Sequence, residues 1–309
     1  MDGILNINKP HGQTSFSIVS MVRRLTGKRR VGHAGTLDPM ATGVLPVCLG
    51  RGTRIIEFLV DTTKTYRAEI EFGIETDTYD AEGTILHKKD SSYISLPQLE
   101  SALDSFRGLI QQIPPMYSAV KHNGKPLYKL ARDGIMVERK SRPVQIYNLE
   151  IIDWHPPVVG IEVVCGKGTY IRSLAHDLGQ ILGCGAYLKN LVRSRCGIFD
   201  IKDASSLTQL EYAFHHGYWQ QFIYPIDDVL LHWSAMVVSD EARQNLKNGL
   251  PLDLSDFNET ENDKSADKYV PDVISSGERC RAYALDGNFL GVLRFNSERQ
   301  YWQPEKVLF

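Results

Sequence analysis

Residues 30–45 read Arg-Val-Gly-His-Ala-Gly-Thr-Leu-Asp-Pro-Met-Ala-Thr-Gly-Val-Leu. Glycines and one proline bracket His33 and Asp38, which favours a tight loop over a regular helix or strand. Loops held between rigid elements often display reactive side chains. Taken singly, an Asp before Pro is more often a turn residue, and a lone His more often satisfies a local hydrogen bond. The function of this loop therefore has to be inferred from the surrounding sequence.

Strands and helices are predicted on both sides of the loop. The first helix is capped by Thr14 or Ser15, presents Phe16 and Val19 on one face, and stops at Gly27. Alternating or continuous apolar residues predict strands over 3–10, 44–49, 66–72, 150–154 and 161–165, and helical spacing predicts helices over 15–25, 54–60, 96–106 and 169–182. Because these elements do not alternate as regular βα units, the predicted fold class is α+β.

The composition changes near residues 219–240. Beyond this break, a short capped helix begins near Val238, and strand-like pieces at 281–285 and 290–295 flank the turn Asp286-Gly287-Asn288. This pattern predicts a small β-rich domain.

Two further predictions concern the C-terminal part of the chain. Residues 253–267 are acidic and poor in large apolar side chains, so we expect a mobile loop there. The chain is expected to divide into domains at 1–232 and 233–309.

Charge is segregated along the chain although the net charge is only −2. Residues 1–60 carry eight Lys/Arg and three Asp/Glu, residues 117–145 seven and two, residues 163–197 five and one, and residues 236–309 nine and thirteen. Three basic stretches that converged on one face would attract a polyanion such as RNA. Charge counts alone leave ordinary solvated surfaces as the alternative.

Other compositional features narrow the class of protein. At 42% hydrophobic and 23% charged, the chain can build a packed core. It contains no signal-like segment and no run of about 18 apolar residues, so we expect a cytoplasmic protein. The five cysteines lack zinc-site spacing and are expected to be buried, reduced thiols: Cys48, Cys165, Cys184, Cys196 and Cys280.

The loop and four further blocks resemble, in the same order, the motifs of the TruB family of tRNA pseudouridine synthases. The family signature is similar to Val31-Gly32-His33, Gly35-Thr36-Leu37-Asp38-Pro39 and Ala41-Thr42-Gly43-Val44-Leu45. The other blocks are Gly3-Ile4-Leu5 through Ser15, Lys64-Thr65-Tyr66, Gln112-Ile113-Pro114-Pro115 through Arg132, and Cys165-Gly166-Lys167-Gly168-Thr169-Tyr170-Ile171-Arg172 through Gly179.

The resemblance implies a fold and a reaction. The fold would be a catalytic domain with a mixed, largely antiparallel sheet flanked by helices, a basic RNA-binding flap at about 112–145, and a small β-rich C-terminal domain like the PUA module. The reaction would convert uridine to pseudouridine in the T-loop of tRNA, at position 55. It moves uracil from an N1 link to a C5 link on the same sugar carbon, without adding atoms or changing oxidation state. We therefore expect no cofactor and no metal.

By resemblance, Asp38 is the catalytic carboxylate, acting on a nucleotide flipped out of the RNA. A carboxylate beside the sugar can serve as nucleophile or as base, and the sequence leaves both open. Arg172 would keep Asp38 ionised and oriented. Tyr66 and Leu191 would line the uracil pocket, although both residue types are also common in cores.

The remaining expected site residues contact RNA. By resemblance, His33 packs against displaced nucleotides, Lys64 flanks Tyr66, and Arg54 lies near the entrance to the active site. In the flap, helical spacing places Lys121, Lys125, Lys129 and Arg132 on one stripe beside Tyr128, either as an RNA-binding surface or as an ordinary exposed helix. The implied partner is the T-arm of tRNA, bound by a monomer.

Three other functions remain open. The chain could be an RNA chaperone that needs no catalysis, or a guide-RNA-dependent synthase that works with protein partners. A glycosidase would also break a sugar bond, but that chemistry usually needs two cooperating carboxylates. The sequence singles out one.

Overall fold

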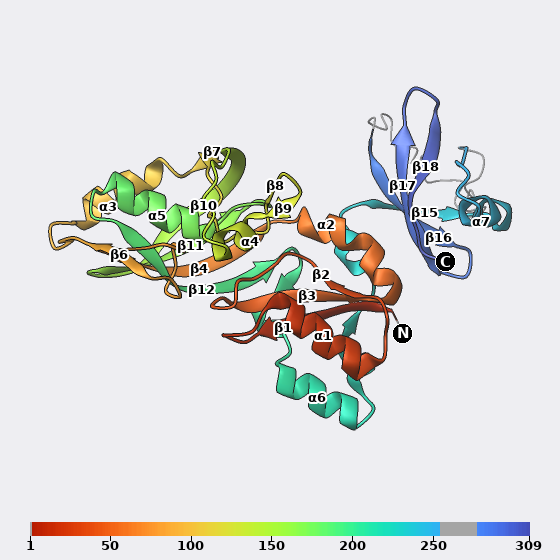
Figure 1. Cartoon of the computed structure of the whole chain (residues 1–309). Helices are drawn as coiled ribbons and strands as arrows, with labels where there is room; N and C mark the ends of the chain where they lie inside the picture. The colour runs from red at the N-terminus through yellow and green to blue at the C-terminus, as the bar shows by residue number, and fades with distance from the viewer. Residues whose placement is uncertain (1, 254–276) are drawn as a thin grey trace.

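The computed structural model describes residues 2–253 and 277–309, and Figure 1 shows a long mixed sheet with a second, smaller sheet beside it. The main sheet contains β1 (Gly3–Lys9), β2 (Val31–His33), β3 (Thr42–Leu49), β4 (Lys64–Phe72), β7 (Gly108–Gln112), β10 (Arg142–His155), β11 (Val158–Cys165), β12 (Ala186–Cys196), β13 (Phe199–Asp200) and β14 (Ile223–Tyr224). Its order is β14-β1-β3-β12-β4-β11-β10-β7, with β2 paired to β3 and β13 to β12. The described pairs are antiparallel except β3 with β12, so the predicted mixed, largely antiparallel sheet is confirmed.

Helices and short hairpins flank this sheet, which confirms the α+β class. The helices are α1 (Ser15–Thr26), α2 (Ile56–Val60), α3 (Leu96–Asp104), α4 (Leu127–Arg132), α5 (Ile171–Ile181), α6 (Leu207–His215) and α7 (Asp240–Lys247), with 3-10 turns η1 (Gly50–Ile55), η2 (Ile201–Asp203), η3 (Trp219–Phe222) and η4 (Asp228–Leu230). The hairpins pair β5 (Ile74–Thr76) with β6 (Ile85–Lys88) and β8 (Lys121–His122) with β9 (Lys125–Pro126). In Figure 1, α1 and α6 lie on the β1–β3 end of the sheet and α3 and α5 on the other end.

The first helix follows its predicted boundaries, and only part of its predicted face is buried. Thr14 caps α1 by accepting a hydrogen bond from the amide of Ser17, and Gly27 ends it at a φ of 65°. Phe16, expected to face inward, is 68% exposed, whereas Ile18 and Val19 are buried. The buried stripe is therefore shifted around the helix, and the apolar Phe16 points to solvent.

The second clearly predicted helix begins slightly later than expected. The N-cap of α5 is Tyr170, and Thr169 donates to the carbonyl of Gly166 instead of opening the helix. Ile181, an apolar residue at the last turn, is 56% exposed. Leu174 and Leu178 on the same helix are fully buried and form its inner face.

A second sheet forms the C-terminal part of the chain. It contains β15 (Ser234–Val238), β16 (Arg279–Ala284), β17 (Phe289–Asn296) and β18 (Tyr301–Val307) in that order, with its own buried cluster. The predicted β-rich C-terminal part is confirmed, as is the turn between β16 and β17. The boundary at 232/233 stays a prediction, which the start of β15 supports. Of the acidic stretch 253–267, all but Asp253 lies outside the described residues.

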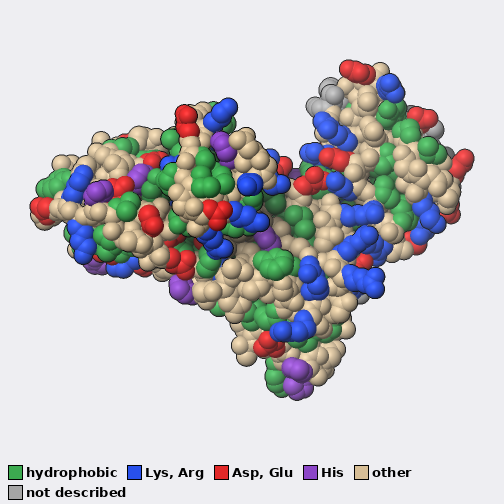
Figure 2. Space-filling view, viewed as in Figure 1, with side chains coloured by type: hydrophobic (Ala, Val, Ile, Leu, Met, Phe, Trp, Pro, Cys, Tyr) green, Lys and Arg blue, Asp and Glu red, His purple; other side chains and the backbone are tan. Residues whose placement is uncertain are grey.

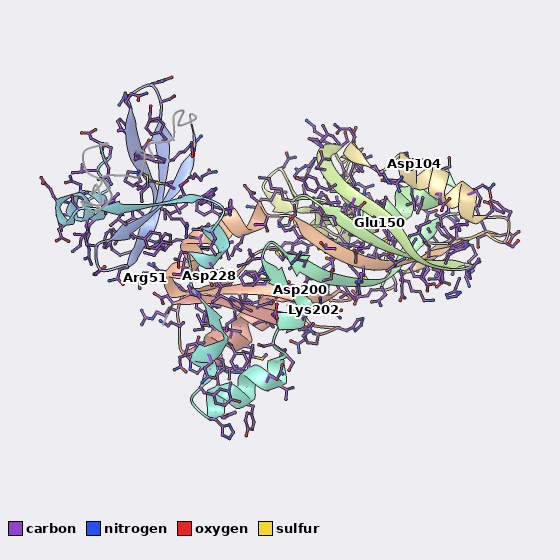
Figure 3. The ribbon with its side chains drawn as sticks, turned by 180° about the vertical axis from the view of Figure 1, so that it is seen from behind. Arg51, Asp104, Glu150, Asp200, Lys202 and Asp228 are labelled. Carbon is purple, nitrogen blue, oxygen red and sulfur yellow. The ribbon has the colours of Figure 1, made fainter. Side chains whose placement is uncertain are left out.

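The two sheets are joined by a packed contact rather than by the chain alone. Phe58 on α2 meets Trp233 edge to face at 5.0 Å, and the guanidinium of Arg279 lies over both rings. Arg51 donates to the carbonyl of Leu308, and Figure 3 shows Arg51 and Asp228 close to this junction. The placement of the C-terminal sheet therefore depends on residues of η1 and α2, which directly follow β3.

Candidate active site

The loop that decides the fold, residues 34–41, connects β2 to β3 and carries Asp38. Its backbone is bound by neighbouring elements. The hydroxyl of Ser15, at the start of α1, accepts from the amide of Leu37 at 2.8 Å and donates to its carbonyl at 3.0 Å. The amide of Gly12 and the ammonium of Lys9 both donate to the carbonyl of Pro39, at 2.8 and 3.2 Å. These bonds restrict where Asp38 can lie.

A buried arginine binds the start of the same loop and the strand that follows it. Arg193 on β12 is 1% exposed; its Nε donates to the carbonyl of Val44 at 2.7 Å and its Nη2 to that of Gly35 at 3.0 Å. A side chain at Gly43 would place its Cβ 2.3 Å from the carbonyl oxygen of Arg193, so glycine is required where β3 and β12 approach each other. The loop is therefore fixed against the centre of the sheet.

Asp38 meets Arg172, as expected from the resemblance. Nη2 of Arg172 donates to Oδ1 of Asp38 at 3.1 Å. Nε lies 2.9 Å from Oδ2, an ion-pair contact without the alignment of a hydrogen bond. The side chain of Arg172 is 5% exposed and that of Asp38 is 34% exposed, so the carboxylate is the accessible partner. The structure thus brings together two residues separated by 134 positions.

A second carboxylate, which the sequence did not single out, contacts the same guanidinium. Oδ2 of Asp80 lies 3.4 Å from Nη1 of Arg172, and its side chain is 4% exposed. Arg172 also donates to the carbonyl of Tyr117 at 2.8 Å. One buried cation is therefore held by two carboxylates and by the backbone of the flap.

The flap base is also bonded to the helix that carries Arg172. The side-chain amide of Gln112 exchanges two hydrogen bonds with the backbone of Tyr170, at 2.9 and 2.7 Å. The hydroxyl of Ser173 donates to the carbonyl of Ile113 at 2.7 Å. Flap position and the geometry around Asp38 are consequently linked through the first turn of α5.

The groups around Asp38 shift its pKa in opposite directions. Burial raises the pKa of Asp38 above its ordinary value, and the positive charge of Arg172 counteracts this rise. The negative charge of Asp80 raises the pKa of Asp38 further, whereas the ammonium of Lys9 lowers it. Burial in turn lowers the pKa of Lys9 to about 8.

Tyr66 and Leu191 lie on one face of neighbouring strands. Tyr66 on β4 pairs with Arg193 on β12, and Ala68 pairs with Leu191, so these four side chains point the same way. Tyr66 is half-buried against the main core, and Leu191 is 5% exposed within it. Burial raises the pKa of Tyr66 to about 12, so its hydroxyl stays protonated at neutral pH. The two side chains therefore share one face of the sheet, with Tyr66 the more accessible of the two.

His33 lies at the end of β2, next to the loop. Burial lowers the pKa of His33, and the charge of Arg193 lowers it further, so its ring is neutral at neutral pH. Its buried Nδ1 has no hydrogen-bond partner within the described residues. A neutral, flat ring at this position can stack on a base.

Arg54 and Lys64 are engaged in contacts within the protein. Arg54 on η1 is exposed but donates to the carbonyl of Val307 in the C-terminal sheet. Lys64 is buried, and its ammonium donates to the carbonyls of Val60 and Thr62 at the end of α2. In this structure the two residues join elements together, and neither ammonium nor guanidinium is free at the loop that carries Asp38.

The flap residues are exposed, but the expected helical stripe is wrong. Lys121 and Lys125 belong to the β8–β9 hairpin, which turns through Asn123 and Gly124 at φ values of 49° and 82°. An Asn-Gly pair is typical of a two-residue hairpin turn, and this signal overrides the helical spacing. Lys129 and Arg132 follow on the short helix α4, where Arg132 lies over the ring of Tyr128 at 5.6 Å.

Three charged residues of the site were missed: Lys9, Asp80 and Arg193. Asp80 follows Thr76-Asp77-Thr78-Tyr79 and precedes Gly83, a run of turn-forming residues that could have marked a second loop. Lys9 and Arg193 interrupt apolar strands at inward positions, which is unusual for cations. Their role depends on contacts across the sheet that no local pattern reveals.

The surface carries positive charge around this region. In Figure 2, Lys and Arg side chains gather near the middle of the visible face and along the junction with the C-terminal sheet, while the far end of the main sheet carries mixed charge.

The described residues include no group of three or more metal-ligating side chains. All five cysteines are free and buried, as predicted. None of the helices in the described ranges has the length and apolar character needed to cross a membrane.

Comparison with known proteins finds two family models and several relatives that match this chain. Residues 23–171 match the TruB family pseudouridylate synthase N-terminal domain, and residues 172–231 match the tRNA pseudouridylate synthase B C-terminal domain. The chain is 45% identical over 307 residues to the tRNA pseudouridine synthase B of Dehalococcoides mccartyi, covering 99% of this chain and 96% of the relative. It is 50% identical over 213 residues to that of Symbiobacterium thermophilum, covering 68% and 71%.

Solved structures with the same fold include a chain of a Cbf5-Nop10-Gar1 complex. That chain has a TM-score of 0.74 and 25% identity, with 99% of this chain and 85% of that chain covered. A chain of an H/ACA RNP bound to a substrate RNA is similar at a TM-score of 0.72 and 23% identity, covering 99% and 85%. The fold of the described residues, including the C-terminal sheet, thus has a structural counterpart.

Proposed function

The chain belongs to the TruB family of pseudouridylate synthases, and from this premise we propose that it converts the T-loop uridine at position 55 of tRNA to pseudouridine, with Asp38 as the catalytic carboxylate. Membership of the family supports the reaction in tRNA. The T-loop position and the role of Asp38 are our proposals.

The observation that carries the proposal is the contact between Asp38 and Arg172. The reaction breaks the bond between C1′ and N1, joins C1′ to C5, and moves the proton of C5 to N1, so substrate and product have the same composition. An ionised carboxylate at the sugar can act as nucleophile or as base in this sequence of steps. Arg172 favours the ionised form and fixes its direction, while the exposed fraction of Asp38 leaves one side open to the nucleotide.

The face that carries Tyr66 and Leu191 supports the binding of an extruded base. Uracil is flat, and a half-buried tyrosine ring next to an aliphatic side chain offers the apolar surfaces against which a flipped base packs. We propose that Tyr66 contacts the uracil and that the neutral ring of His33 stacks on a displaced neighbouring nucleotide.

The flap supports binding of the T-arm backbone. Lys121, Lys125, Lys129 and Arg132 are exposed, and the flap has its own small apolar cluster beneath them. We propose that these side chains contact phosphates and that Tyr128 presents a flat surface to the RNA. Arg54 and Lys64 act in this proposal through the elements that they connect.

We propose that the chain works alone, as a monomer, rather than with a guide RNA. The curated relatives that resemble it over nearly their full length are named tRNA pseudouridine synthase B, whereas the Cbf5 chain, which comes from a complex with other proteins, is less similar. A chaperone that needs no catalysis would not require an oriented carboxylate, and the Asp38–Arg172 pair speaks against it. We further propose that residues 233–309 form a PUA-like RNA-binding domain.

The test is incubation of the purified chain with an unmodified tRNA transcript, followed by mapping of pseudouridine. We expect modification at position 55 without added protein, guide RNA, metal or cofactor. A transcript with cytidine at position 55 should remain unmodified. Modification elsewhere would contradict the proposed position, and a requirement for further components would contradict the stand-alone form.

Asp38→Asn tests the catalytic assignment, because it preserves shape and removes charge. We expect tRNA binding to stay close to that of the wild type and turnover to fall by at least about 100-fold, the lower range for loss of an acid–base group. Asp61→Asn is a matched control on an exposed ion pair with Lys167. Wild-type turnover by Asp38→Asn would remove Asp38 from the mechanism.

A further inference from the structure

The loop of residues 77–84, between β5 and β6, brings Asp80 to Arg172. It is attached to β12 by two backbone bonds, from the amide of Leu188 to the carbonyl of Tyr79 at 2.9 Å and from the amide of Ala81 to the carbonyl of Leu188 at 3.0 Å. Oδ1 of Asp80 accepts from the hydroxyl of Thr78, which leaves Oδ2 directed at Nη1 of Arg172. The orientation of this buried carboxylate thus depends on the conformation of the loop.

The same loop contacts α5 at a second place. The ring of Tyr79 stacks on the ring of His176, with centroids 3.8 Å apart and planes inclined by 13°. His176 follows Arg172 by four residues, so both lie on the same side of α5, one turn apart. The loop therefore meets α5 through the Tyr79 ring and, at Nη1 of Arg172, through the Asp80 carboxylate and the carbonyl of Thr78, which accepts at 3.5 Å.

The backbone of Tyr79 is in an unfavourable conformation. Its φ is 65°, a region that glycine and asparagine enter readily and that aromatic residues rarely adopt. Strained residues of this kind persist where surrounding contacts hold them, and they gather at functional sites. The stack is the side-chain contact that fixes Tyr79 at the position directly before Asp80.

The ring of His176 has no hydrogen bond at its buried Nδ1, in the part of the chain that the structure describes, to fix it independently of the stack. The nearest carboxylate oxygen is Oε1 of Glu75 at 3.5 Å, beyond ordinary hydrogen-bond length. The His176 ring thus contacts Tyr79 by stacking and Glu75 only through this longer ion-pair contact.

We propose that Tyr79 and His176 are positioning residues for pseudouridine formation. Their stack keeps the loop in the strained conformation that presents Asp80 to Arg172, and so keeps Arg172 aligned on Asp38. This inference rests on the proposed function for its effect on rate. Neither ring is assigned a contact with the nucleotide; both act through the Asp80–Arg172 contact.

The experiment compares variants that separate the stack from the backbone conformation. Tyr79→Asn removes the ring and retains a residue that tolerates positive φ, whereas Tyr79→Phe and His176→Phe keep a flat ring. Tyr212→Asn is a matched control, because Tyr212 on α6 stacks on His216, which caps the end of that helix, at 3.9 Å, outside the described contacts of the site. Each full-length variant is assayed for single-turnover rate and tRNA affinity with an unmodified transcript.

We expect Tyr79→Asn to lower the rate about three- to tenfold, the range that corresponds to loss of one aromatic pair, with unchanged tRNA affinity. Tyr79→Phe, His176→Phe and Tyr212→Asn should stay within about twofold of the wild type. In an Asp80→Asn background, Tyr79→Asn should add less than about twofold, because the stack acts through Asp80. A full additional loss in that background, or a wild-type rate for Tyr79→Asn, would overturn the proposal.

Hydrogen exchange gives a readout that does not depend on turnover. Tyr79→Asn should speed exchange of the amides of Ala81 and Leu188, which bond the loop to β12, and Tyr79→Phe should leave them unchanged. A wild-type chain that left uridine unmodified would contradict the proposed function. The exchange measurement would still test whether the stack holds the loop. Unchanged exchange in Tyr79→Asn would refute the positioning role even in an active enzyme.

Discussion

Lys9 and Arg193 bind the same loop at different carbonyls: the ammonium of Lys9 lies 3.2 Å from the oxygen of Pro39, and Nη2 of Arg193 lies 3.0 Å from that of Gly35. The two residues are 0% and 1% exposed, and neither has an ion pair within 4 Å among the residues that the structure describes. Burying a cation is unfavourable unless its donors are bonded. Here the donors of Lys9 and Arg193 are bonded to backbone carbonyls around Asp38. The position of that carboxylate therefore depends on these two buried cations.

Arg193→Lys should therefore destabilise the fold. A lysine cannot donate to the carbonyls of Gly35 and Val44 in the same geometry, and one buried acceptor would be left without a donor. We expect the free energy of unfolding to fall by about 1–3 kcal/mol. Urea denaturation measures this, with Arg195→Lys as the control, because Arg195 lies on the same strand and its side chain is 57% exposed. Equal stability of the two variants would contradict this account.

Gly43→Ala tests the close approach of β3 to β12. The added Cβ would lie 2.3 Å from the carbonyl oxygen of Arg193, at a φ of 101°. Gly124→Ala is the matched control, since its φ of 82° carries similar strain and nothing lies within 4 Å of the added atom. We expect Gly43→Ala to lower the melting temperature clearly more than Gly124→Ala, whose cost is about 1 kcal/mol. Similar melting temperatures would show that the strands can move apart.

The local elements were predictable because their signals are local. Thr14 and Gly27 mark both ends of α1 through capping chemistry, and the alternation along 66–72 identifies β4 within two residues. The flap hairpin was missed because four cations at helical spacing were given more weight than Asn123-Gly124. The outward position of Phe16 shows that apolar spacing fixes a helix better than it fixes which side of the helix is buried.

The residues of the site likewise divide into those that the sequence indicated and those that it did not. Asp38 and Arg172 were both predicted from the resemblance to the family motifs, and the structure places their side chains in contact. Asp80 and Arg193 were not identified, because their contacts are made across strands and loops that are distant in sequence. The helix cap of Lys64 and the contact of Arg54 with Val307 likewise appear once α2 and β18 are placed.

Arg172→Lys should reduce turnover while leaving tRNA binding nearly unchanged. A lysine supplies one compact charge and cannot reach Asp38, Asp80 and the carbonyl of Tyr117 together. Loss of a charge-assisted hydrogen bond corresponds to about a 10- to 100-fold lower rate. Single-turnover assays with saturating enzyme measure this, and Lys167→Arg, on an exposed pair with Asp61, is the control. A wild-type rate would exclude Arg172 from the site.

The acid limb of the rate profile should move in opposite directions in two variants. The proposed active form of Asp38 is ionised, so the rate falls as the pH drops through its pKa. Asp80 raises the pKa of Asp38 and Lys9 lowers it. Asp80→Asn should therefore lower that pKa and extend activity to lower pH, whereas Lys9→Met should raise it and bring the loss of activity to higher pH.

This prediction is checked by single-turnover rates measured from neutral pH downwards until activity is lost. Each variant is normalised to its own plateau, which separates a shift in pKa from a general loss of rate. If the pH at which activity is lost moved in the same direction in both variants, structural damage rather than the charge of residue 80 or 9 would explain the change.

The flap should contribute to affinity through charge rather than through sequence-specific contacts. Each Lys that meets a phosphate releases counterions, so its removal lowers the steepness with which the association constant falls as salt is raised. Lys121→Gln and Lys125→Gln should each reduce that slope by about one, and together by about two. Binding is measured by fluorescence anisotropy with a T-arm stem-loop at several salt concentrations. Lys88→Gln on β6, at the far end of the sheet in Figure 1, should leave the slope unchanged. A flap variant with the wild-type slope would place its lysine away from the phosphates, and then the hairpin would have to act through shape alone.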